Sequence, residues 1–128
     1  MISFLRSRAR SFGNAFSGLG YVLRTQRNAW IHATASLFAF GSAFWVGLER
    51  HDWALIVFAV ALVWTAEFVN TALEAVVDLH SPQEHPLAKV GKDVGAAAVL
   101  IAALAAVIIG LLVLGAPVVD KVGLLLDL

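Results

Sequence analysis

Acidic and amide side chains recur at helical spacing within one strongly apolar part of the sequence. Glu67, Glu74 and Asp78 follow an apolar run that begins at Trp53, and Asn70 stands among them. At about 100° per helical residue, Glu74 and Asp78 each lie about 20° from Glu67 around the axis. Three carboxylates therefore share one helix face and spread over about 16 Å along it.

A membrane helix carries such groups at a cost. Each charged residue near the centre of a span costs about 2.5–3.5 kcal/mol on an insertion scale. Acids in these positions usually face a bundle interior and mark an ion, proton or substrate site. Carboxylate and amide oxygens also suit Mg²⁺. Two alternatives use the same residue types: a hydrogen-bond network between helices, above all for Thr71, and a small oligomeric proton or cation conductor.

The composition indicates one small integral-membrane domain spanning residues 1–128. The chain is 60% hydrophobic, which is too apolar for a soluble domain of this length. It has no cysteine, so disulfides, thiol nucleophiles and thiolate metal sites are excluded. The formal net charge is zero, and we expect no nucleic-acid partner. We also expect no cleavable signal peptide, because no apolar stretch of sufficient length directly follows the basic N-terminus.

Periodicity predicts an all-α membrane protein with an amphipathic surface helix and three transmembrane helices. The surface helix is expected over residues 11–27, with Ser11 as its N-cap and an apolar face suited to the membrane interface. Pro117 is expected to end the last span. The three spans are predicted at residues 29–48, 53–78 and 94–114.

Basic residues predict the orientation in the cell (inner) membrane. Five arginines precede the first span, and Lys89 and Lys92 follow the second, whereas the opposite side has only Arg50 and Lys121. The positive-inside rule then puts the N-terminus and the 79–92 loop in the cytoplasm. The acidic face runs toward that side, where a water-soluble reactant and a lipid can both reach it.

A long, ordered pattern resembles the prokaryotic diacylglycerol kinase family. The pattern is Glu67-x-x-Asn70-Thr71-Ala72-x-Glu74-x-x-x-Asp78, then His85-Pro86-Leu87-Ala88-Lys89 and Lys92-Asp93. Two further segments resemble the undecaprenol kinase branch of this family. They are Arg27-Asn28-x-x-Ile31-His32 and the loop Ser81-Pro82-x-x-His85-Pro86-Leu87-Ala88-Lys89. The resemblance covers about residues 12–113. It implies a homotrimeric lipid kinase that uses ATP and Mg²⁺ to convert undecaprenol to undecaprenyl phosphate. The alternative substrate is diacylglycerol, which would yield phosphatidic acid.

The resemblance also implies roles for individual residues. Glu67 resembles the general base that contacts the lipid hydroxyl and takes its proton. Glu74 resembles the carboxylate that binds Mg²⁺ with the nucleotide. Arg27 and Trp30 match positions near the lipid. The other nucleotide-binding positions are matched by Tyr21, Asn70, Asp78, Gln83, Glu84, His85, Lys92 and Asp93.

Two departures separate this chain from the diacylglycerol-specific branch. Ala33 stands where that branch has a metal-binding acid, and Asn14 stands where it has an arginine. The undecaprenol-type branch also lacks the acid, so the difference concerns the substrate more than the activity. His32 is interpreted as a hydrogen-bonded interfacial residue rather than a ligand.

Assembly is expected to complete the site. Because a three-helix bundle covers the acidic face only partly, we expect Glu67 and Glu74 to face a groove shared with a neighbouring subunit. Small residues in the first and third spans would allow close helix contacts. The loop should bring Lys92 and Asp93 back beside Asp78.

Overall fold

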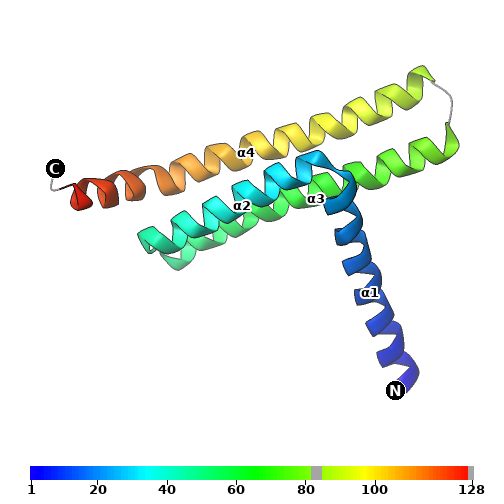
Figure 1. Cartoon of the computed structure of the whole chain (residues 1–128), viewed down its shortest axis with the longest axis horizontal. Helices are drawn as coiled ribbons and strands as arrows, with labels where there is room; N and C mark the ends of the chain where they lie inside the picture. The colour runs from blue at the N-terminus through cyan, green and yellow to red at the C-terminus, as the bar shows by residue number, and fades with distance from the viewer. Residues whose placement is uncertain (82–84, 127–128) are drawn as a thin grey trace.

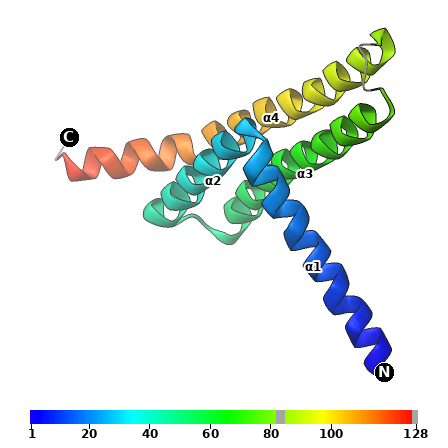
Figure 2. The same cartoon turned by 45° about the vertical axis from the view of Figure 1, so that its right-hand side comes forward.

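The chain folds into four helices within the part that the structure describes. The structure is a computed structural model, and it describes residues 1–81 and 85–126. The helices are α1 (Ile2–Thr25), α2 (Arg27–Val46), α3 (Arg50–His80) and α4 (Pro86–Leu125). Helices α2, α3 and α4 lie side by side along their lengths, whereas α1 leaves the start of α2 and points away from them (Figures 1 and 2).

Helices α2, α3 and α4 are each long and apolar enough to cross a membrane. This confirms the predicted all-helical, multi-pass architecture. Helix α3 has 31 residues and α4 has 40, whereas about 20 residues cross the hydrocarbon core of a bilayer. The α3–α4 hairpin therefore extends well beyond the length that a single crossing requires, and its polar end carries part of the candidate site.

The interior of the bundle is narrow and is built mainly from small side chains. Large apolar side chains such as Phe38, Phe44 and Leu112 remain exposed, as helices that face lipid or another subunit require. The buried apolar residues are Val22, Ala29, Ala43, Ile56, Ala59, Val63, Val99 and Ala102. Small residues let the backbones approach closely, so the few polar groups between the helices are well enclosed.

Local sequence features set the junctions that orient the helices. Gln26 has an extended backbone (φ −102°, ψ 117°) and separates α1 from α2. Gly47 ends α2 in the left-handed region at φ 78°, where glycine carries no steric penalty. His85 precedes Pro86, the first residue of α4, and its Nδ1 accepts a hydrogen bond from the backbone N–H of Leu87.

The predicted start of the surface helix at Ser11 is wrong. Helix α1 begins at Ile2, and the Ser11 hydroxyl donates to the carbonyl of Ser7 from inside the helix rather than capping it. The preceding residues favour helix, and the Arg8 guanidinium lies 5.2 Å from the centre of the Phe4 ring one turn away. The surface helix therefore begins earlier in the sequence than the spacing of its apolar residues predicted.

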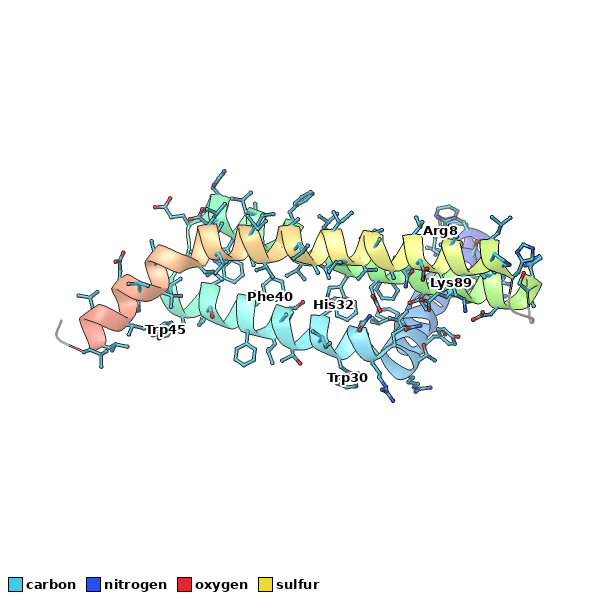
Figure 3. All side chains as sticks on the ribbon, turned by 90° about the horizontal axis from the view of Figure 1, so that it is seen from above. Arg8, Trp30, His32, Phe40, Trp45 and Lys89 are labelled. Carbon is cyan, nitrogen blue, oxygen red and sulfur yellow. The ribbon has the colours of Figure 1, made fainter. Side chains whose placement is uncertain are left out.

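The expectation that Pro117 ends the last helix is also wrong. Pro117 lies inside α4, which continues to Leu125. Proline removes one helical hydrogen bond and crowds the preceding turn, so it bends a helix when the flanking sequence keeps helical conformation. Figure 3 shows α4 changing direction in its orange-to-red part.

Candidate active site

The acidic face of α3 is buried in the bundle at Glu67 and becomes exposed toward Asp78. The exposed fractions of Glu67, Asn70 and Thr71 are only 1%, 8% and 4%. Glu74 is half-buried and Asp78 is exposed, so polarity and solvent access both increase toward the α3–α4 turn. Thr71 donates its hydroxyl to the Glu67 carbonyl at 2.9 Å, which satisfies it within its own helix.

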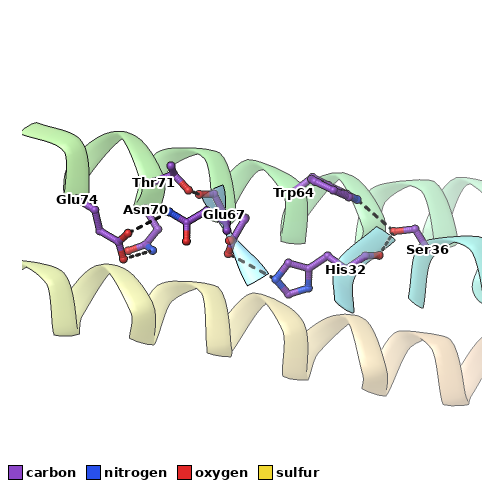
Figure 4. A network of polar contacts seen from close by, with 8 residues as sticks. His32, Ser36, Trp64, Glu67, Asn70, Thr71 and Glu74 are labelled. Carbon is purple, nitrogen blue, oxygen red and sulfur yellow. Dashed lines mark hydrogen bonds and ion pairs between the residues drawn. The ribbon is translucent and has the colours of Figure 1, made fainter. Parts of the chain in front are cut away.

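Glu74 is the centre of an amide–carboxylate cluster. The Asn70 Nδ2 donates to Glu74 Oε1 at 3.0 Å, one turn along α3. From the α1–α2 junction, the Gln26 Nε2 donates to Glu74 Oε2 at 3.3 Å. Figure 4 shows Asn70 and Glu74 within this polar network. Each carboxylate oxygen therefore has one amide donor, and the junction that separates α1 from α2 holds one of these donors in place.

Helix α4 fixes the orientation of the Asn70 amide. The Asn70 Oδ1 is buried and accepts no hydrogen bond within the described part of the chain. It lies directly against Gly95 of α4, where an added Cβ would overlap it. The absence of a side chain at Gly95 thus makes room for the amide, with its nitrogen toward Glu74 and its oxygen toward α4.

Glu67 faces His32 across the α2–α3 interface. Glu67 Oε2 lies 3.5 Å from His32 Nε2, longer than a standard hydrogen bond, and neither atom has another partner among the described residues (Figure 4). Helix α2 thus covers Glu67 within its own chain, which differs from the expected groove between subunits. His32 is a partner of the proposed base rather than an isolated interfacial residue.

Two side chains hold the His32 segment against α3. The Trp64 ring meets the His32 ring edge-on, with centroids 6.3 Å apart and planes at 70°. The Trp64 Nε1 donates to the Ser36 Oγ at 3.2 Å, and that hydroxyl donates to the His32 carbonyl at 2.7 Å. The imidazole therefore occupies a defined position beside Glu67.

A cavity of about 230 Å³ opens between α2, α3 and α4. Its polar part is lined by Gln26, Asn28, His32, Asn70 and Glu74. Its apolar part is lined by Ala96, Val99, Leu100 and Ala103 of α4. A polar end beside an apolar wall suits a molecule with a hydrophilic head and a hydrocarbon chain.

The α3–α4 turn brings opposite charges together. The Lys92 Nζ contacts Asp78 Oδ1, which confirms the predicted return of Lys92 beside Asp78. Asp93 instead pairs with Lys89 at 2.8 Å on the surface of α4. Lys92 precedes the apolar stretch of α4, and its hydrogen bond to Asp78 raises the pKa of the lysine above its ordinary value of 10.5. The ammonium group is therefore charged at neutral pH.

Other predicted residues do not line the cavity in the described part of the chain. Tyr21, Arg27 and Trp30 are exposed near the α1–α2 junction, and His85 is exposed beside Pro86. Gln83 and Glu84 lie outside the described residues.

Three contributors to the site were missed from the sequence. Gln26 is a single uncharged residue at a junction, and Gly95 is one of several glycines in apolar helices, so neither carried a signal. For His32 a signal existed, because an intramembrane histidine and an intramembrane glutamate each need a partner. Pairing His32 with Glu67 on that ground would have placed α2 against α3.

The donor groups fit a magnesium ion that is shared with a nucleotide. Among the described residues, no three His, Cys, Asp or Glu side chains gather into a metal site. Mg²⁺ is usually held by one or two carboxylates together with waters and substrate phosphates rather than by an all-protein cage. The Glu74 carboxylate supplies oxygens of the required kind, whereas Asn70 Oδ1 is buried against Gly95 and turned away from Glu74.

The fold and site define a small multi-pass membrane protein with a cluster of carboxylate and amide side chains between its helices. The sequence model described as "Prokaryotic diacylglycerol kinase" matches residues 13–114, and the chain belongs to this family of membrane lipid kinases.

Relatives in the family carry two different names. The chain is 45% identical over 101 residues to a Synechocystis protein named diacylglycerol kinase, covering 78% of this chain and 58% of the relative. It is 38% identical to the Bacillus subtilis protein named undecaprenol kinase, covering 81% and 85%. It is 34% identical to the Escherichia coli K12 diacylglycerol kinase, covering 81% and 91%. The chain thus spans less than two thirds of the length of the Synechocystis protein. The names of these relatives differ in the lipid that each protein is said to phosphorylate.

Proposed function

We propose that this protein transfers the γ-phosphoryl group of ATP to undecaprenol in a reaction that requires Mg²⁺. The observation that carries the proposal is the cavity, in which the Glu74 cluster meets an apolar wall of α4. The Arg27-Asn28-x-x-Ile31-His32 motif and Ala33 favour undecaprenol. The identity to the Synechocystis protein favours diacylglycerol as the alternative acceptor.

Phosphoryl transfer depends on positioning and charge neutralisation, and the site is organised for both. Glu74, held by Gln26 and Asn70, is proposed to bind the metal–nucleotide complex. When bound, Mg²⁺ would neutralise negative charge on the phosphates. Glu67 is proposed to act as the general base that takes the proton from the lipid hydroxyl.

The outer residues complete the proposed substrate contacts. Arg27 and Trp30, exposed at the start of α2, are proposed to meet the lipid. The polar end of the α3–α4 hairpin would approach the nucleotide. Its proposed contributors, together with Tyr21, are Asp78, Gln83, Glu84, His85, Lys92 and Asp93.

A homotrimer with the α3–α4 turn in the cytoplasm of the cell is the proposed assembly. Exposed apolar side chains along α2 and α4 supply surfaces that other subunits and lipid would cover. Helix α1 leaves the bundle at the start of α2 and points away from it, so it can lie along the membrane surface (Figure 2). The excess of basic residues on this side supports the orientation.

The test is a direct phosphorylation assay in lipid nanodiscs. Full-length protein is supplied with labelled ATP, Mg²⁺ and either undecaprenol or diacylglycerol, and the labelled lipid is quantified. We expect faster labelling of undecaprenol. Faster labelling of diacylglycerol would overturn the substrate assignment. Ion flux through the protein without nucleotide, together with no lipid phosphorylation, would instead identify a conductor.

A further inference from the structure

The first half of α1 has exposed side chains throughout. Every side chain from Phe4 to Leu19 is exposed, and this part of the helix extends away from α2, α3 and α4 (Figures 1 and 2). The exposed fractions of Leu5, Phe12 and Phe16 are 60%, 66% and 71%. Several large apolar side chains exposed on one helix mark an interaction surface.

These three side chains form an apolar stripe along α1. At about 100° per helical residue, Phe12 and Phe16 each lie about 20° from Leu5 around the axis, on opposite sides of it. A helix with one such face lies in the plane of the membrane interface, with the apolar side buried about 5–10 Å into the bilayer. The residues beside the stripe then decide which headgroups the helix meets.

Arginines flank the apolar stripe on both sides. Arg8 lies about 60° from Leu5 on one side, and Arg6 lies about 100° from it on the other, with Arg10 about 40° further on. All three arginines are exposed, and none forms an ion pair with a residue that the structure describes. Residues 1–48 contain no Asp or Glu. The positive charge of this segment is therefore not compensated nearby in the chain.

We propose that residues 4–16 of α1 bind anionic phospholipids at the membrane surface. The apolar stripe enters the interface, and Arg6, Arg8 and Arg10 contact headgroup phosphates, whose geometry the guanidinium fork matches. The three arginines precede residues 13–114, the part that matches the family model. The lipid contact therefore lies outside the matched segment and depends neither on the acceptor lipid nor on phosphoryl transfer.

The combination of charge and apolar surface selects a membrane over a nucleic acid. A nucleic acid would engage the arginines but would leave Leu5, Phe12 and Phe16 exposed to water. A bilayer with anionic lipids engages both, and the three candidate membrane spans hold α1 beside one. Each arginine near an anionic surface strengthens binding about fivefold, so three together contribute about 10²-fold. The proposed orientation places α1 on the cytoplasmic side, where the surface potential is negative.

The test measures how deeply α1 enters nanodiscs of defined composition. Because the chain has no cysteine, one introduced cysteine can carry a spin label. Ala9→Cys places the label about 40° from Leu5, near the apolar stripe, and Ser7→Cys places it about 160° away on the opposite side. The readout is accessibility to a water-soluble nickel chelate, for full-length protein in phosphatidylcholine with or without phosphatidylglycerol. Phosphatidylglycerol should protect the label at Ala9 and leave the label at Ser7 accessible.

Charge variants show whether the arginines cause this protection. In the Ala9→Cys background, Arg6→Gln, Arg8→Gln and Arg10→Gln together should lower the ratio of inserted to free helix about 10²-fold. Glutamine has a helix propensity similar to that of arginine, so the helix itself should persist. The triple replacement by lysine keeps the charge and should retain the response to phosphatidylglycerol. The matched control is Arg50→Gln at the start of α3, which alters an exposed arginine and should leave the label protected.

Three results would overturn the proposal. Equal accessibility at Ala9 with and without phosphatidylglycerol would show that lipid charge does not hold the helix. An undiminished response in the triple glutamine variant would exclude the arginines as its cause. Binding of a labelled RNA that requires the arginines, without protection at Ala9, would identify the other class of partner. The readout needs neither ATP nor an acceptor lipid, so its failure is distinct from a failed phosphorylation assay.

Discussion

A methyl group added at Gly95 should disturb the magnesium and nucleotide end of the site from the neighbouring helix. In Gly95→Ala the new Cβ would overlap the Asn70 Oδ1 and would also lie 3.3 Å from Asn70 Cγ and Leu73 Cδ2. The Asn70 amide must rotate, or α4 must move away from α3. Either response weakens the 3.0 Å hydrogen bond from Asn70 Nδ2 to Glu74.

The magnitude follows from that bond and from the crowding. A hydrogen bond to a charged group contributes about 1.5–3 kcal/mol, and 1.36 kcal/mol corresponds to tenfold. The Mg²⁺ and ATP concentrations for half-maximal activity should therefore rise about 10- to 100-fold. Overpacking should also lower the free energy of unfolding by about 1–3 kcal/mol.

The assay is lipid phosphorylation as a function of Mg²⁺ and ATP, with thermal unfolding in the same detergent. Gly110→Ala is the matched control on the same helix, because its Cβ would meet no heavy atom within 4 Å. Alanine at Gly110 should raise stability by about 0.5–1 kcal/mol through helix propensity. The two substitutions should thus change stability in opposite directions.

A double substitution shows whether Asn70 is the cause. In the Asn70→Ala background the obstructing amide is gone, so Gly95→Ala should weaken Mg²⁺ and ATP use little further. The reasoning would be refuted by wild-type Mg²⁺ and ATP dependence in Gly95→Ala, or by full additivity of the two substitutions. Either result would mean that Gly95 does not position the Asn70 amide.

Three further predictions concern the carboxylates. Glu67→Gln should keep the fold and lower kcat about 10²-fold or more, whereas the exposed Glu49→Gln should not; near-normal turnover would remove Glu67 from proton transfer. Glu74→Gln should raise the Mg²⁺ requirement and weaken ATP use together, and an unchanged Mg²⁺ titration would contradict its role as ligand. Mixed oligomers of Glu67→Gln and Asn70→Ala subunits should show no more activity than Asn70→Ala alone, because Glu67 and Asn70 are both buried on the inner face of the same helix, α3. Regained activity would show that different chains supply them.

The predictions from sequence succeeded where helical geometry alone decides. The spacing of Glu67, Asn70 and Glu74 sets their common face, and the short loop returns Lys92 to Asp78. Contacts between helices could not be predicted from the spacing of residues within one helix. The partner of His32 depends on how α2 packs on α3.

The start of α1 and the end of α4 were predicted wrongly for a similar reason. Ser11 and Pro117 are residues that often mark helix ends, but the adjoining segments kept helical conformation in both cases. A local signal at one residue was outweighed by its neighbours. These errors moved helix ends without moving the residues around the cavity.

The bend at Pro117 bears on how the protein fits membranes of different thickness. At about 1.5 Å per residue, α4 is about 60 Å long, twice the roughly 30 Å of a hydrocarbon core. A rigid rod of that length would adapt to a thinner bilayer by tilting as a whole. A bend near the far end lets the last turns change direction instead, while the α3–α4 contact around Gly95 keeps its angle. A change in bilayer thickness would then alter only the end of α4 farthest from Glu74. The arrangement of side chains around the proposed site would stay unchanged.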